Sequence, residues 1–168
     1  MAMRTFRDRL EFDAERGEYL DNGIRYMMIR PDALMGILHE LDETHRQPVL
    51  EAFARSITRA GSKSAQAYQG MGAADADALT ATIQATAPEL GWGRWRLSRV
   101  ENGLDLSVEN SPFVEGYGPH QEPVCYPIVG MLRAVGRMVL GGDVNVAEIA
   151  CAAADEETVC RFEVRLSA

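Results

Sequence analysis

Basic residues are scarce in this chain. Its 168 residues include 17 Lys and Arg against 25 Asp and Glu, which gives a formal net charge of −8. Direct nucleic-acid binding is therefore not expected, because that binding depends on cationic side chains that release counterions from the phosphate backbone. No apolar run approaches the ~20 residues that span a bilayer. Four charged residues near the start also leave no apolar signal segment: Arg4, Arg7, Asp8 and Arg9. We predict a cytoplasmic protein without membrane contact.

Common catalytic motifs are missing as well. The chain has no Gly-x-x-x-x-Gly-Lys-Ser/Thr, no Gly-x-Gly-x-x-Gly and no nucleophile elbow. Only three histidines occur; His39 and His45 fall where solvated surface groups are expected, and His120 falls in the connector Tyr117-Gly118-Pro119-His120. This pattern does not favour an enzyme, and a redox role would need a reductant or a partner enzyme from outside.

Turn signals and hydrophobic periodicity predict an α+β fold. Asn22-Gly23 and Asn102-Gly103 supply the positive φ angles of tight hairpin turns. Between Trp92 and Glu109, apolar and polar residues alternate, which is typical of antiparallel strands with one dry face. We expect one domain over 1–168, in which helices cover an antiparallel four-stranded sheet after an amino-terminal hairpin and helices. The expected helices cover 31–41, 48–68, 74–87 and 126–140, and the expected strands 19–29, 92–109, 144–152 and 158–166, with a turn at 154–157.

Two details of the first helices matter for packing. Leu34, Ile37, Leu38 and Leu41 have the spacing of one helix face and are expected to dock together. Gly61 marks either the end of the second helix or a tight crossing with another helix.

Cysteine is rare, and its placement is the most informative feature of the chain. The three cysteines, Cys125, Cys151 and Cys160, occur in the last third together with Glu148. Three thiolates and one carboxylate make a closed tetrahedral shell for zinc, as in structural sites. The alternative is that the cysteines are small buried apolar residues, and the spacing alone leaves both interpretations open. A disulfide is less favoured, because the count is odd and no secretory segment is seen.

The carboxyl-terminal half resembles the 4-vinyl reductase domain family. The resemblance rests on Asn110-Ser111-Pro112-Phe113, on Glu122-Pro123-Val124-Cys125-Tyr126, on Val146-Ala147-Glu148-Ile149-Ala150-Cys151 and on Cys160-Arg161-Phe162-Glu163-Val164. That family includes the ligand-sensing domains of phenol- and xylene-responsive activators and a bacteriochlorophyll-synthesis protein. Its fold is related to that of trafficking-complex subunits. The resemblance implies that Cys125, Glu148, Cys151 and Cys160 bind zinc within a core over 91–166. It also implies that 1–45 is a dimerisation segment.

The resemblance further implies a pocket for a small hydrophobic or aromatic molecule between the sheet and the helix after Cys125. The predicted lining is Trp95, Leu104, Leu106, Phe113, His120, Val129, Leu132 and Val146. For each aliphatic residue the alternative is ordinary core, and Trp92 and Trp95 are either pocket or packing residues. In the phenol sensors a histidine and a tryptophan hold the ligand hydroxyl. The matching strand positions here are aliphatic, which argues against phenol.

Three functions follow as hypotheses. The first is a zinc-stabilised, homodimeric sensor or carrier of a small apolar ligand, with a protein partner for its output. The second is an accessory or reductase-like subunit in tetrapyrrole (bacteriochlorophyll) or aromatic metabolism. The third is a scaffold without a ligand. The sequence favours the first.

Overall fold

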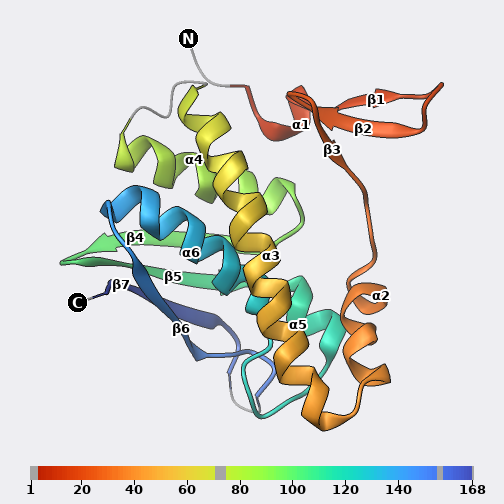
Figure 1. Ribbon diagram of the computed structural model, residues 1–168, viewed down its shortest axis with the longest axis vertical. Coiled ribbons are helices and arrows are strands. Elements are labelled where there is room, and N and C mark those ends of the chain that lie inside the picture. The colour runs from red at the N-terminus through yellow and green to blue at the C-terminus, as the bar shows by residue number, and fades with distance from the viewer. Residues whose placement is uncertain (1–3, 71–74, 155–156, 168) are drawn as a thin grey trace.

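The computed structural model describes residues 4–70, 75–154 and 157–167. A four-stranded sheet, the helices packed on it and a smaller amino-terminal sheet make up the structure (Figure 1). The amino-terminal elements are α1 (Phe6–Arg9), β1 (Glu11–Asp13), β2 (Glu18–Asp21), β3 (Ile24–Tyr26), α2 (Pro31–Gly36) and the 3₁₀ helix η1 (Ile37–Glu40). The others are α3 (Glu43–Gly70), α4 (Ala76–Glu89), β4 (Arg94–Val100), β5 (Gly103–Glu109), α5 (Pro112–Tyr117), α6 (Tyr126–Leu140), β6 (Val144–Ala150) and β7 (Cys160–Leu166).

The larger sheet is antiparallel throughout, with strand order β4-β5-β7-β6. Its inner face is apolar because alternate residues of each strand point toward the helices: Leu106 lies opposite Leu97 on one side and Phe162 on the other. On its outer face, charged side chains pair across strands, such as Arg165 with Asp105 at 2.8 Å. The predicted α+β fold with a four-stranded antiparallel sheet is confirmed.

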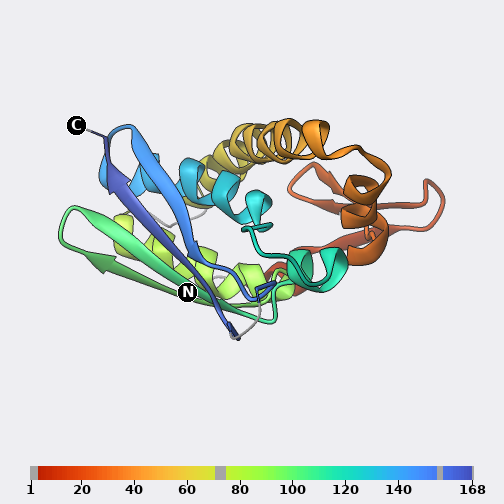
Figure 2. The ribbon, with the colours of Figure 1, turned by 90° about the horizontal axis from the view of Figure 1, so that it is seen from below.

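Helices cover only the inner face of this sheet (Figure 2). α4 and α6 lie on it, and α3 crosses over α6 as a further layer. The crossing is close because Gly130 of α6 faces the backbone of α3: a Cβ there would lie 2.3 Å from the carbonyl oxygen of Ala54. The hydroxyl of Thr58 also donates a hydrogen bond to the Gly130 carbonyl at 3.0 Å. α3 runs through Gly61 without ending, so of the two predictions for Gly61 the helix crossing is the one observed, beside Met131 of α6.

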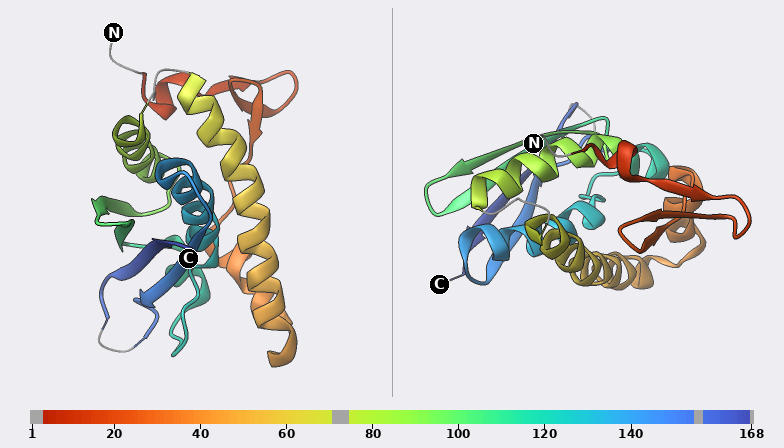
Figure 3. Two further views of the ribbon diagram at one scale, coloured as in Figure 1. Left: turned by 60° about the vertical axis from the view of Figure 1, so that its left-hand side comes forward. Right: turned by 90° about the horizontal axis from the view of Figure 1, so that it is seen from above.

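The amino-terminal sheet projects from the body beside the upper end of α3 (Figures 1 and 3). The predicted turn is confirmed, since Asn22 and Gly23 have φ angles of 50° and 76°. β3 ends at Tyr26, however, and the next three residues continue as an exposed extended segment. The predicted first helix is divided into α2 and η1, and this division leaves Ile37 55% exposed instead of docked with its leucine neighbours.

The remaining differences are local. α3 begins at Glu43 and not near Pro48, which lies inside the helix. α5 was not expected, although Ser111-Pro112 is a typical helix start. The turn predicted at 154–157 and the start of the helix at 74–87 fall partly outside the described residues. Of the helices within residues 4–70, 75–154 and 157–167, none is long and apolar enough to cross a membrane.

Candidate metal centre and ligand cavity

Three structural elements bring the predicted metal ligands together. Cys125 caps the start of α6, Glu148 lies near the end of β6, Cys151 follows that strand and Cys160 begins β7. Their ligand atoms, three Sγ and one carboxylate oxygen, all lie within 4.8 Å of one another. The Sγ atoms of Cys125 and Cys160 are 3.7 Å apart. The start of α6, the end of β6 and the start of β7 thus bring the four residues to one point.

Polar groups of the surrounding chain hold these ligands. The amide of Cys125 donates to Glu148 Oε2 at 3.0 Å, and the amide of Ala152 donates to Cys160 Sγ at 3.3 Å. The buried hydroxyl of Ser111 is 3.2 Å from Cys125 Sγ. Donors aimed at sulfur favour thiolates, as does the positive end of the α6 dipole at Cys125. Such outer contacts orient ligands for a metal.

The four acidic groups compete for charge when no cation is present. Burial, together with the charge of Cys151, raises the pKa of Glu148 to about 9. Hydrogen bonds from Cys125 and Cys160 lower the pKa of Cys151 to about 2, while the hydrogen bond to Cys151 raises the pKa of Cys125 well above its usual value. The hydrogen bond with Cys125 lowers the pKa of Cys160, but the contact with Cys151 and burial raise it by more, to about 12. One negative charge is thus favoured, on Cys151.

A cation would change this balance, and the donor set fits zinc. Glu148 Oε1 is the one buried side-chain oxygen or nitrogen within the described residues that has no hydrogen-bond partner. An unpaired buried carboxylate oxygen among three sulfurs is costly unless an ion binds it. Zinc binds both thiolate sulfur and carboxylate oxygen, and four protein ligands close its tetrahedral shell as in structural sites. The arrangement can hold an ion that joins β6, β7 and the start of α6.

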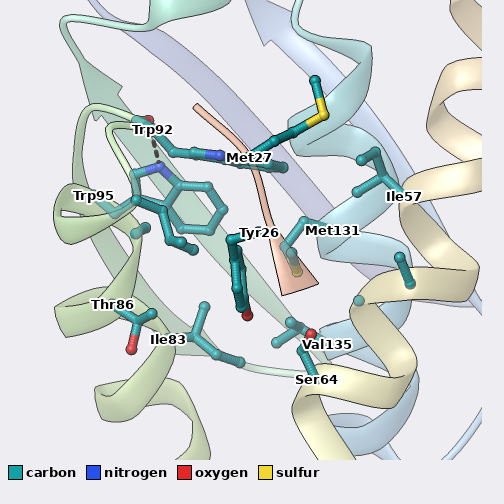
Figure 4. A pocket seen from close by; sticks show the side chains of 14 residues that line it. Tyr26, Met27, Ile57, Ser64, Ile83, Thr86, Trp92, Trp95, Met131 and Val135 are labelled. Atoms are coloured by element: carbon teal, nitrogen blue, oxygen red, sulfur yellow. Dashed lines mark hydrogen bonds between the residues drawn. The ribbon is translucent and has the colours of Figure 1, made fainter. Parts of the chain in front are cut away.

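An apolar cavity of about 250 Å³ lies at a separate place, among α3, α4 and α6 (Figure 4). Trp92 and Trp95, at the start of the large sheet, form one wall, and Tyr26 reaches in from β3. Met27, 76% exposed, lies at the mouth. The remaining lining comes from the three helices: Ile57, Ala60, Gly61 and Ser64 of α3, Ile83, Thr86 and Ala87 of α4 with the adjacent Leu90, and Met131 and Val135 of α6.

The cavity wall is short of polar groups. Of the residues that the structure describes, none with a charged side chain lines it. The indole N–H of Trp95 donates to the carbonyl of Trp92 at 2.9 Å and is therefore already used (Figure 4). The side-chain hydroxyls in the lining belong to Tyr26, Ser64 and Thr86. Such a wall suits an uncharged, mainly apolar molecule.

The predicted pocket residues lie in several different places. Leu104, Leu106 and Leu132 are at most 2% exposed and fill the space between the sheet and α6. That space was predicted to be the pocket, and the cavity instead lies on the α3 and α4 side of α6, where Trp95 is the one predicted residue that lines it. Phe113 lines a neighbouring surface cavity, and Val129 and Val146 line a third one beside Glu148. The ring of His120 packs against Tyr117, with centroids 5.1 Å apart.

Sequence reasoning missed most of the cavity wall. Ile57, Ile83 and Val135 fall within the helices expected over 48–68, 74–87 and 126–140, and nothing in their spacing separates a wall residue from a core residue. Tyr26 and Met27 were assigned to a strand of the first hairpin. Their position at the mouth depends on how that hairpin folds back onto α3 and α4, which periodicity does not reveal.

Comparisons with known proteins agree with this architecture. Residues 104–166 match the V4R domain. This range lies inside the core predicted over 91–166. The predicted resemblance is confirmed. No curated protein matches the chain. Among solved structures, the phenol-responsive sensory domain of the transcription activator PoxR, crystallised with phenol, has a TM-score of 0.80 at 18% identity. The match covers 95% of this chain and 86% of that one.

Two more distant structures share the fold. A trafficking protein particle complex subunit 3 from Naegleria fowleri, covalently bound to palmitic acid, has a TM-score of 0.57 at 11% identity, covering 82% of this chain and 95% of that chain. A vinyl-4-reductase family protein from Methanocaldococcus jannaschii has a TM-score of 0.52 at 14% identity, covering 87% and 100%. At these identities the likeness concerns the fold.

Proposed function

We propose that this V4R-like protein is a zinc-stabilised binding domain for a small, uncharged aromatic or hydrocarbon ligand, which it senses or carries. The observation that supports the proposal most is the apolar cavity beside Trp92 and Trp95. An engineered apolar cavity of about 150 Å³ binds benzene. A cavity of about 250 Å³ therefore has room for one aromatic ring with small substituents. The likeness to a phenol-sensing domain supports a sensory role.

The side chains that line the cavity limit which class of ligand can bind. The described lining contains no cationic side chain. Burial of a ligand carboxylate there would therefore cost several kcal/mol. A phenol would exchange the hydration of its hydroxyl for, at most, the hydroxyls of Tyr26, Ser64 or Thr86, because the Trp95 N–H stays bound to Trp92. We expect toluene and ethylbenzene to bind more tightly than phenol, and benzoate not to bind. The tetrapyrrole alternative is less favoured, because even drug-sized ligands need about 300–1,000 Å³.

Zinc would support the cavity indirectly. An ion bound by Cys125, Glu148, Cys151 and Cys160 would fix the start of α6 against the hairpin of β6 and β7. α6 also carries Met131 and Val135, which line the cavity. Holding this helix in place would keep the wall from collapsing inward. Zinc therefore has a structural role in this proposal.

A dimer through residues 1–45, with a separate protein partner for output, completes the proposal. The exposed apolar residues of this segment give it support: Phe12 at 59%, Met27 at 76%, Met28 at 77% and Ile29 at 47% exposure. Apolar side chains gathered on one exposed segment favour association with another surface. Sedimentation analysis of the native chain would show a dimer, and Met28→Glu would reduce dimer formation.

Tryptophan fluorescence tests the ligand proposal directly, because the only two tryptophans of the chain both line the cavity. Titration with toluene should change their emission with saturation. Ser64→Phe fills the cavity from α3 and should abolish the change. Ser56→Phe places the same ring on an exposed position of the same helix and serves as the matched control. Equal toluene binding by both variants would refute the proposed ligand site.

A further inference from the structure

Glu148 differs from the other three ligand candidates in its surroundings. The side chains of Cys125, Cys151 and Cys160 are at most 4% exposed. Glu148 is only partly buried and lines a surface cavity of about 180 Å³, whose lining also includes the exposed residues Pro123 and Ala147. The cavity therefore extends to the carboxylate side of the cluster, where Glu148 Oε1 itself is buried.

The carboxylate is also held weakly. Its Oε2 accepts one hydrogen bond, from the Cys125 amide, and its Oε1 has no partner. The pairing of β6 with β7 shifts register between Glu148 and Ala150, so the strand is irregular where the carboxylate approaches the sulfurs. If Glu148 left a bound ion, Oε2 would keep its amide contact and Oε1 would gain access to the water of the cavity.

We propose that Glu148 is the replaceable ligand of the metal centre, and that a small thiol entering through this cavity takes the fourth coordination position. This inference rests on the zinc site proposed above. In such an exchange Glu148 would give up its bond to the ion, the thiol sulfur would bind in its place, and the thiol proton would pass to the released carboxylate, with no change in oxidation state. A thiol is the favoured class because soft sulfur suits zinc.

The cavity wall suits a small uncharged thiol. Arg133 of α6 lines it and forms an ion pair with Glu51 of α3 at 3.3 Å, both side chains being partly exposed. Glu51 also lines the cavity, so the charges of this pair balance and an uncharged thiol can enter. Val129 and Val146 make the remaining wall apolar enough for a short alkyl thiol.

The test uses the full chain loaded with Co²⁺, whose sulfur charge-transfer absorption reports the number of bound thiolates. Addition of 2-mercaptoethanol should raise this absorption by about one third, as three bound sulfurs become four, with the cobalt content unchanged. An unchanged spectrum with cobalt still bound would overturn this inference and leave the metal site standing. A protein that binds neither cobalt nor zinc would overturn the inference and the zinc proposal together.

Two substitutions on β6 test the route. Val146→Phe fills the cavity and should slow both the spectral change and the transfer of zinc to a chelator at least tenfold. Ile149→Phe, next to Glu148 but 56% exposed and outside the lining, is the matched control and should leave both rates unchanged. Equal rates in the two variants would exclude this cavity as the path, whereas the cobalt spectrum of the native protein tests the ligand exchange without any substitution.

Discussion

Metal binding should release about three protons at neutral pH, one of them from Glu148. In the metal-free fold the raised pKa values of Cys125, Glu148 and Cys160 keep these groups protonated at pH 7, while Cys151 carries the charge. A bound zinc ion requires all four ligands to be deprotonated. Because the bound state holds fewer protons, higher pH favours it. Three protons correspond to about 4 kcal/mol per pH unit, roughly a thousandfold in affinity.

The variant Glu148→Gln distinguishes a folded metal-free site, in which Glu148 is protonated, from a metal-free chain that is simply unfolded. If the metal-free chain were unfolded, its three cysteines would release their protons and Glu148 would already be ionised, since its unperturbed pKa lies near 4.3. The proton count would then stay at three in the variant. If the metal-free site is folded, Glu148→Gln should release two protons when zinc binds. Calorimetric zinc titrations in two buffers of different ionisation enthalpy measure the count, and three protons from Glu148→Gln would refute a protonated, buried Glu148.

Three further predictions concern stability. Cys151→Ser should lose zinc and lower the melting temperature sharply, since structural zinc contributes on the order of 10 kcal/mol; a variant with native zinc content and melting temperature would contradict the site. Gly130→Val should cost about 3 kcal/mol in urea unfolding, because its Cβ would meet the Ala54 carbonyl at 2.3 Å, whereas Gly36→Ala, with open space around it, should be nearly neutral. Leu104→Ala should cost about 2–5 kcal/mol yet leave toluene affinity unchanged, and a loss of affinity would place the ligand between the sheet and α6.

Local patterns were sufficient to predict the large sheet. The alternation in Trp95, Leu97, Leu104 and Leu106 marks an inner face, because side chains on a strand alternate between its two faces. Asn102, with a φ angle of 57°, lies in the turn between these strands, and Gly103 begins β5 opposite Val100. The spacing of the rare cysteines left two interpretations open, and the resemblance to the 4-vinyl reductase domain family selected the metal site. The meeting of the four ligand atoms within 4.8 Å is a property of the tertiary fold that agrees with that interpretation.

The position of the ligand cavity was beyond such patterns. Leu104 and Val135 are both apolar residues on regular elements, yet one fills the core and the other faces a void. Val135 lies on α6, which α3 crosses in close contact at Gly130 and Ala54, and residues of both helices line the cavity. The lining also includes Tyr26, which reaches the cavity from the amino-terminal sheet. These are contacts between distant segments, and hydrophobic periodicity carries no information about them.

A crystal structure of the zinc-loaded protein grown with toluene would test the central claim most directly. The account predicts an aromatic ring beside Trp92 and Trp95, among α3, α4 and α6, and one ion bound by three sulfurs and Glu148. Closed side chains in that cavity, or toluene bound between the sheet and α6, would contradict it.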